Sequence, residues 1–171
     1  RPPRVLPAGP AREPTSALSR ADVLLVRRDA DATEPLPGRV FDRPCLGFRL
    51  CPRHWHESAS GRTIAIEAMR EPVVALSGLA RPRSFEDSLR ATAVQLRGSW
   101  RGPDHWEPER SELTLIERWA QGLGATALVC PEKNLRRLAV HEPLLPLLAL
   151  VAGIEWEVDD PLDAIGVLDR V

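Results

Sequence analysis

The strongest constraint on the fold is the alternation of short apolar runs with helical patterns in the second half of the chain. The apolar runs, which have the length of buried strands, lie at residues 73–76, 94–96, 125–130 and within 147–158. Helical patterns occupy residues 84–92, 111–121, 131–138 and 161–168. Strands that alternate with helices predict a mostly parallel sheet covered on both faces. Residues 72–171 are therefore expected to form a small α/β domain.

The first part of the chain has a different pattern. Residues 39–71 hold short strand candidates at 40–41, 46–50 and 63–68, with Pro44, Pro52 and residues 58–61 between them. This predicts a β-hairpin or meander that links two α/β parts. Upstream, the proline-rich residues 1–22 favour an extended loop. A short helix is expected at 17–20, capped by Thr15 or Ser16, and a strand at 23–26.

Composition narrows the class of protein. The chain has 171 residues, with 23 Lys and Arg against 24 Asp and Glu, so nothing in its charge points to nucleic acid. Three cysteines cannot form a disulfide framework, which favours a reduced, cytoplasmic setting. No apolar run reaches the roughly 18 residues of a membrane span, so the chain is expected to be soluble. Because it opens at Arg1 and its single methionine is Met69, we expect a piece of a longer protein.

Ligands of parallel α/β sheets bind beyond the carboxyl ends of the strands. That rule selects the loops at residues 77–83, 98–106 and 131–134. Asp104 and His105 could form a general-base pair, or His105 could be an ordinary loop residue with Trp106 packed beneath it. Lys133, the only lysine, could bind phosphate, although a helix-start turn explains its position equally well.

Arg12 and Glu13 stand in a stiff stretch of glycine and proline. A fixed guanidinium suits phosphate because its fork matches two oxygens at once, and the carboxylate could hold Mg²⁺ or orient the arginine. The alternative is a surface ion pair.

A second cluster offers the residue types of a zinc site, at Cys45, Cys51, His54 and His56. The spacing is unusual for zinc, so no metal site is assigned, and buried thiols are the simpler interpretation. Arg53, Trp55 and His56 could alternatively touch a membrane surface. The 171 residues contain no P-loop sequence, no G-x-S-x-G and no H-E-x-x-H.

Four motifs in order resemble the tetraacyldisaccharide 4'-kinase family, the lipid A 4'-kinases. Residues 5–14, VLPAGPAREP, with Leu18 and residues 20–22, are similar to that family's "LPAGPLREP…L.RAD". Residues 75–82 with Phe85 are similar to "A.SGIARP..F", and residues 103–105 to "PDH". Glu132, Lys133 and Leu138 are similar to "TEKD…L". The resemblance covers nearly the whole chain but only the C-terminal half of the family's length.

The resemblance implies a P-loop NTPase-like kinase that moves the γ-phosphate of ATP, with Mg²⁺, to the 4'-hydroxyl of a lipid A disaccharide precursor. Such kinases work at the cytoplasmic face of the inner membrane of Gram-negative bacteria. Residues 1–38 would then be the end of the N-terminal P-loop domain, residues 39–71 a β linker, and residues 72–171 the C-terminal domain.

The resemblance also implies residue roles. His105, beside Asp104, would activate the hydroxyl together with an aspartate of the missing N-terminal domain. Arg12 would serve the phosphates, Glu13 would lie near the metal, and Lys133 would contact phosphate or nucleotide.

The chain departs from the family pattern at several positions. Ala11 replaces leucine, Gly102 stands where an aromatic is usual, and Trp106 follows His105. Pro131 and Asn134 flank Glu-Lys in place of threonine and aspartate. Without a P-loop, the chain is expected to be inactive by itself. A non-catalytic α/β binding module is the alternative; a glycosyltransferase-like nucleotide-sugar domain matches the α/β pattern but none of the four motifs.

Overall fold

The computed structural model describes residues 4–9, 11–28 and 32–157, so the helix expected at 161–168 lies outside the described residues. The chain divides into two compact units. Unit 1 comprises Arg1–Leu50 and Ile154–Val171, and unit 2 comprises Cys51–Gly153.

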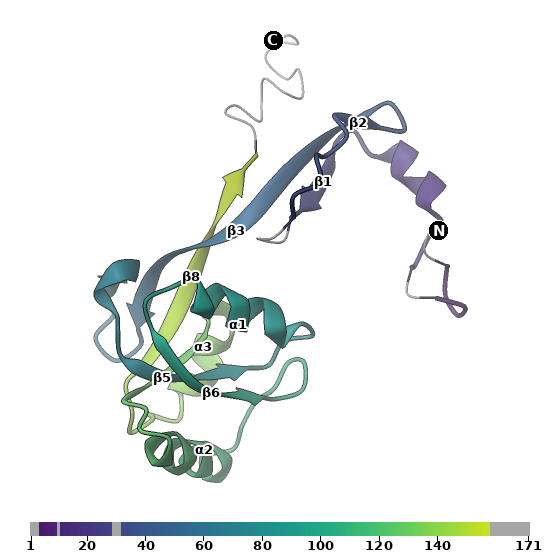
Figure 1. Cartoon of the computed structure of the whole chain (residues 1–171). Helices are drawn as coiled ribbons and strands as arrows, with labels where there is room; N and C mark the ends of the chain where they lie inside the picture. The colour runs from purple at the N-terminus through teal and green to yellow at the C-terminus, as the bar shows by residue number, and fades with distance from the viewer. Residues whose placement is uncertain (1–3, 10, 29–31, 158–171) are drawn as a thin grey trace. The chain divides into compact units, whose positions relative to one another are not determined.

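Unit 2 is built on a parallel sheet, as the alternating pattern predicted. Its strands are β5 (Pro72–Ser77), β6 (Gln95–Arg101), β7 (Ala127–Pro131) and β8 (Leu147–Trp156), in the order β8-β7-β5-β6. Each neighbouring pair in this order is parallel. The connections are α1 (Pro82–Arg90), α2 (Arg110–Gly122) and α3 (Glu132–Ala139). Figure 1 shows α1 and α2 on opposite sides of β5 and β6.

Two apolar cores fill the two faces of this sheet, because successive strand residues point to opposite sides. On one face Val74 and Leu76 of β5 pack with Ile116 of α2 and Leu138 of α3. On the other face Val73, Ala75 and Val129 pack with Phe85 and Leu89 of α1. The expectation of a sheet covered on both faces is confirmed.

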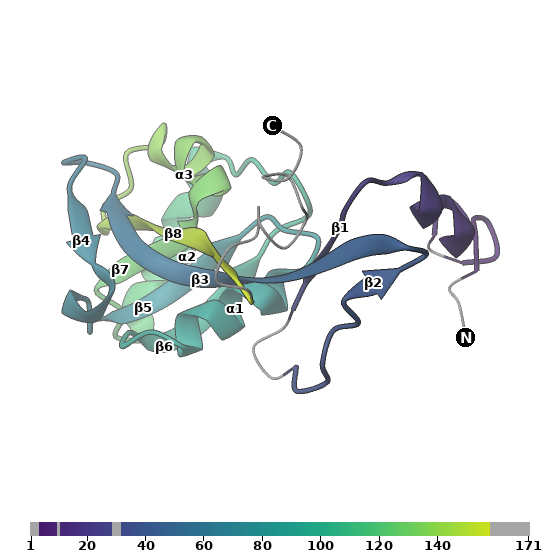
Figure 2. The same cartoon turned by 90° about the horizontal axis from the view of Figure 1, so that it is seen from above.

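The short strand predicted at residues 46–50 is part of a much longer one. β3 (Arg43–Glu57) runs without interruption through Pro44 and Pro52, where the sequence predicted breaks. Proline removes a backbone donor. Pro44 lies opposite Arg39 near the start of the strand, and Pro52 falls between the residues that pair with β1 (45–48) and those that pair with β4 (Thr63–Ala65), which are 54–56. The antiparallel β3–β4 hairpin, followed by the 3₁₀ turn η2 (Ile66–Ala68), is visible from above in Figure 2.

Unit 1 holds the other half of β3. β1 (Leu24–Arg27) runs parallel to it, and β2 (Arg39–Val40) pairs with it antiparallel through a turn in which Phe41 and Asp42 have positive φ. The predicted short helix is the 3₁₀ helix η1 (Thr15–Arg20), which starts after Pro14 without the expected side-chain cap.

Two predictions in unit 2 were wrong in detail. The loop expected at residues 98–106 begins only at Gly102, because β6 continues to Arg101. Gly98 is not a turn residue; an added Cβ would lie 2.9 Å from both Trp119 and Leu123, so this glycine lets α2 approach β6. The helix expected at Ser84 begins at Pro82, a residue favoured in the first helical turn.

Candidate functional site

The sheet order places a ligand edge between β5 and β7. From β5 the chain first forms β6 on one side of β5 in the sheet. It then returns to form β7 and β8 on the other side of β5, so the direction in which strands are added reverses between β5 and β7. Ligands of such sheets bind in the crevice at this switch point, outside the carboxyl ends of the strands. The loops after β5, β6 and β7 meet this edge, as the sequence predicted.

The loop after β6 is folded back on the end of β5. The Gly102 amide donates to the Ser77 carbonyl at 2.9 Å, and the Trp106 amide donates to the Pro103 carbonyl at 3.0 Å. Trp106 is only 7% exposed, and its Nε1 donates to Glu112 Oε2 at 3.4 Å. This buried anchor leaves Asp104 and His105 on the outer side of the loop, with His105 at a φ of 61°.

Three predicted site residues meet here: Asp104 and His105 from the loop after β6, and Lys133 from the first turn of α3. Asp104 Oδ2 lies 3.9 Å from His105 Nε2, and Asp104 Oδ1 lies 3.8 Å from Lys133 Nζ. The His105 amide also donates to Asp104 Oδ1 at 3.2 Å. The His105 side chain is 77% exposed. The arrangement presents an accessible imidazole and an ammonium group on either side of one carboxylate.

The first turn of α3 adds an unpaired polar atom. The helix starts after Pro131 without a side-chain cap, and Asn134 is 3% exposed. Asn134 Oδ1 is the buried side-chain oxygen or nitrogen that lacks a hydrogen-bond partner among the described residues. Buried acceptors are normally paired. The sequence had marked Asn134 as a departure from the family pattern.

Arg12 and Glu13 belong to unit 1. Their loop is closed by hydrogen bonds from the Leu6 amide to the Ala11 carbonyl, 2.8 Å, and from the Ala11 amide to the Arg4 carbonyl, 3.2 Å. The Glu13 carboxylate pairs with Arg20 and not with Arg12. Arg12 is exposed and makes no ion pair within the described part of the chain.

The Cys and His cluster does not assemble. In unit 2, Cys51, His54 and His56 lie along the extended strand β3, whose side chains alternate between its two faces. Within residues 4–9, 11–28 and 32–157 no group of three His, Cys, Asp or Glu side chains could hold a metal. The membrane alternative for Trp55 was wrong: its side chain is fully buried in the core beside α1, and Nε1 donates to the Ile66 carbonyl at 3.4 Å.

Two buried carboxylates of unit 2 escaped the sequence analysis. Glu86 of α1 is 3% exposed and pairs with Arg101 at the end of β6. Glu117 of α2 is 2% exposed, and its Oε1 accepts from the Leu145 amide at 3.0 Å. The available signal was a glutamate on the apolar face of a helix, next to Phe85 in one case and Ile116 in the other.

The fold defines an α/β protein whose sheet has a topological switch point between β5 and β7. The family model described as tetraacyldisaccharide-1-P 4'-kinase matches residues 2–170. The chain belongs to the tetraacyldisaccharide-1-phosphate 4'-kinase family.

Individual relatives agree with this assignment. The tetraacyldisaccharide 4'-kinase of Methylobacterium sp. strain 4-46 is 37% identical over 147 residues, which are 82% of this chain and 41% of the relative. That of Anaeromyxobacter dehalogenans is 36% identical over 157 residues, which are 87% and 40% of the two chains. The chain therefore spans about two fifths of the length of these relatives.

A solved structure shares the fold. The "apo" form of LpxK from Aquifex aeolicus, crystallised in complex with ATP, superposes with a TM-score of 0.64 at 21% identity. The match covers 98% of this chain and 48% of that one. The described residues of this chain include no helix long and apolar enough to cross a membrane.

Proposed function

We propose that this chain is the C-terminal part of a kinase that transfers the γ-phosphate of ATP to the 4'-hydroxyl of a tetraacyldisaccharide 1-phosphate. One observation carries the proposal: in a chain of this family, Asp104, His105 and Lys133 lie together at the ligand edge of the sheet. The proposed place of work is the cytoplasmic face of the bacterial inner membrane. A P-loop domain from the remainder of the protein would bind the nucleotide.

In this mechanism the 4'-oxygen forms a bond to the γ-phosphorus while the bond to the β-phosphate oxygen breaks and ADP leaves. His105 takes the proton of the hydroxyl, which its exposed position allows it to reach. Lys133 supplies positive charge to the phosphate oxygens, and Arg12 supplies a fork of donors. Phosphoryl transfer depends mainly on such positioning and charge stabilisation.

Magnesium in kinases is held by one or two carboxylates together with the substrate phosphates. Glu13 is the carboxylate that the family resemblance assigns near the metal, and in this structure it pairs with Arg20. Among the described residues no group of three His, Cys, Asp or Glu side chains could hold a metal ion. A role for Glu13 beside the metal stays a prediction, and no step above depends on it.

Substitution of His105 by alanine in the full-length protein tests the proposal. General-base catalysis contributes roughly 100-fold or more, so we expect His105→Ala to lower kcat by at least that factor. ATP-dependent phosphorylation of the purified lipid measures it. The control His141→Ala removes a histidine of the same unit outside the three loops and should leave kcat unchanged.

Two outcomes would contradict the proposal. Unchanged turnover in the His105→Ala protein would remove His105 from the mechanism. If the wild-type full-length protein phosphorylates no lipid, the non-catalytic binding module becomes the better description.

A further inference from the structure

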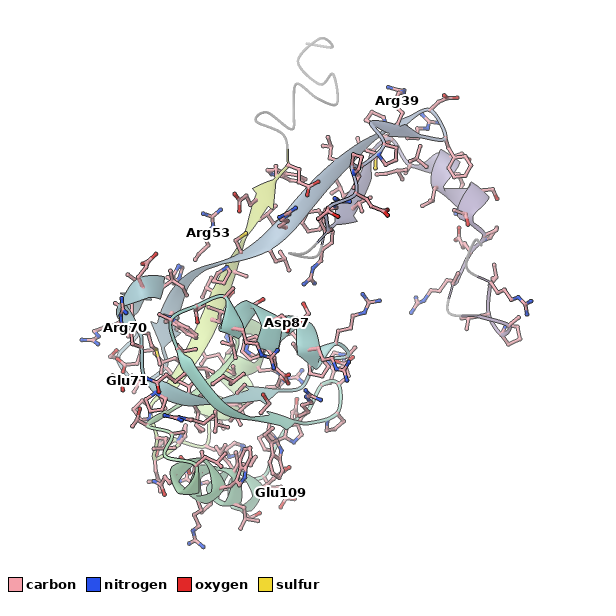
Figure 3. All side chains as sticks on the ribbon, in the orientation of Figure 1. Arg39, Arg53, Arg70, Glu71, Asp87 and Glu109 are labelled. Atoms are coloured by element: carbon pink, nitrogen blue, oxygen red, sulfur yellow. The ribbon has the colours of Figure 1, made fainter. Side chains whose placement is uncertain are left out.

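An ion pair with a buried carboxylate joins α1 to the end of β6. Arg101 Nε donates to Glu86 Oε1 at 2.7 Å, and Arg101 Nη2 donates to Glu86 Oε2 at 2.8 Å. Both carboxylate oxygens are thus held by one guanidinium fork. The Glu86 side chain is 3% exposed, whereas that of Arg101 is 47% exposed. Asp87, labelled in Figure 3, marks the neighbouring position on α1.

This pair sits at the base of the loop that carries the candidate site. Arg101 is the last residue of β6 and lies in register with Ser77, the last residue of β5. The next residue, Gly102, bonds to the Ser77 carbonyl and begins the loop to Trp106. The fork therefore fixes the direction of the chain three residues before Asp104.

A second, weaker contact holds the far side of the loop. Arg137 Nε of α3 lies 3.3 Å from Glu107 Oε1, one residue after Trp106. Both of these side chains are substantially exposed, at 35% and 71%. Exposed pairs restrict geometry little, whereas a bidentate pair with a buried carboxylate restricts it strongly.

Stability alone does not account for the buried carboxylate, since well-packed apolar residues stabilise such sites equally well. The two parallel hydrogen bonds fix the angle between α1 and the end of β6, which an apolar contact does not do. We infer that the Glu86–Arg101 pair is a positioning device that holds the loop at residues 102–106, and with it Asp104 and His105, in the geometry used for phosphoryl transfer. This inference rests on the proposed function.

The test uses the full-length protein and two substitutions at one position. Arg101→Lys keeps the charge but loses the fork, and Arg101→Ala loses both. Arg97→Ala is the matched control, because Arg97 lies on the same strand and bonds only to Gln95 among the described residues. Hydrogen exchange of the peptide with the amides of Gly102, His105 and Trp106 reports loop opening without any need for activity.

We expect the 102–106 peptide to exchange about tenfold faster in Arg101→Ala, by an intermediate factor in Arg101→Lys, and at the wild-type rate in Arg97→Ala. We expect kcat to fall about tenfold in Arg101→Ala with KM for the lipid unchanged, because small displacements of reacting groups are costly. In a His105→Ala background, Arg101→Lys should cause no further loss of kcat.

Unchanged exchange in both Arg101 variants would overturn the inference. So would faster exchange together with wild-type kcat, or an equal loss of kcat with and without His105. If the wild-type protein phosphorylates no lipid, the proposed function fails, and the exchange rates alone then decide whether the pair holds the loop. If the Arg101→Ala protein does not fold, the exchange rate and kcat of Arg101→Lys are compared with those of the wild type and of Arg97→Ala instead.

Discussion

The Trp106 side chain fills the space beside two glycines of the candidate site. Gly102 precedes it by four residues in the loop after β6, and Gly78 directly follows β5. An added Cβ at Gly102 would overlap the Trp106 ring, and one at Gly78 would lie 2.8 Å from Trp106 Cβ. The ring thus fills the volume that Gly102 leaves empty, and it seals the loop against both glycines. A side chain at either glycine would therefore displace Trp106, which anchors the loop that carries the exposed His105.

The proposed role of Arg12 leads to a prediction in the full-length kinase. Arg12→Lys keeps the charge but cannot reproduce a two-oxygen contact with phosphate. Hydrogen bonds to charged groups contribute about 1.5–3 kcal/mol, so the loss of one arm predicts a kcat/KM about tenfold lower. Steady-state phosphorylation kinetics measure it.

A control substitution at another arginine of unit 1 shows whether the lower kcat/KM is specific to Arg12 or follows from any exchange of arginine for lysine. Arg39, labelled in Figure 3, belongs to the same unit and bonds to the Asp42 carbonyl. Arg39→Lys should leave kcat/KM unchanged. Equal kinetics in the Arg12→Lys protein would make Arg12 a surface residue without a part in transfer.

At the scale of elements, periodicity predicted α2 well, because Leu113, Ile116 and Ala120 recur on one face. Trp119 lies at the edge of this face: its side chain is 38% exposed, and its ring contacts the ring of Trp100 of β6. Periodicity identifies a face and does not say where its edge lies. Gly98 was interpreted as a loop residue because a close approach between helix and strand leaves no local sequence signal.

Packing on α2 predicts a contrast between two neighbouring residues. Ile116 is fully buried and Leu115 is 63% exposed. Because truncation of a buried isoleucine loses apolar contacts and leaves a cavity, Ile116→Ala should lower the free energy of unfolding by about 2–5 kcal/mol. Leu115→Ala should change it by less than about 0.5 kcal/mol. Urea titration followed by tryptophan fluorescence measures both, and equal effects would contradict the assigned helix face.

At the scale of the whole molecule, the ion pair between Glu86 and Arg101 predicts that the folded protein loses stability at acidic pH. Hydrogen bonding from Arg101 lowers the pKa of Glu86, and the same bond raises the pKa of Arg101. Because the Glu86 pKa is depressed on folding, the stabilisation it gives is present above its ordinary value of 4.5 and is lost as pH falls through the lower folded value.

The measurement is the free energy of unfolding between pH 3 and pH 7. Wild-type protein should lose stability below about pH 4.5 more steeply than the Glu86→Gln variant, in which this carboxyl group is absent. Glu67→Gln removes an exposed glutamate of the same unit and should keep the wild-type slope. A Glu86→Gln slope equal to that of wild type would contradict the paired state of Glu86.

The sequence predicted the class of fold and the three loops of the site, since both follow from strand and helix alternation. It did not reveal the Glu86–Arg101 pair, because its partners are 15 residues apart on different elements. Nor did it show that Asp104 would face Lys133, which depends on how the loops after β6 and β7 meet. Contacts between loops arise from the tertiary structure, which local patterns do not encode.

The division of the chain into units also predicts the order in which the two units complete their folding during synthesis. Unit 2 is one continuous segment, whereas unit 1 consists of two segments that flank it. In unit 1, Glu157 contacts Arg28, 129 residues earlier, and Arg49, 108 residues earlier. Domains usually fold in the order in which they leave the ribosome. Here the unit whose translation starts first is completed last, because Arg28 and Arg49 must wait for Glu157 until all of unit 2 has been made.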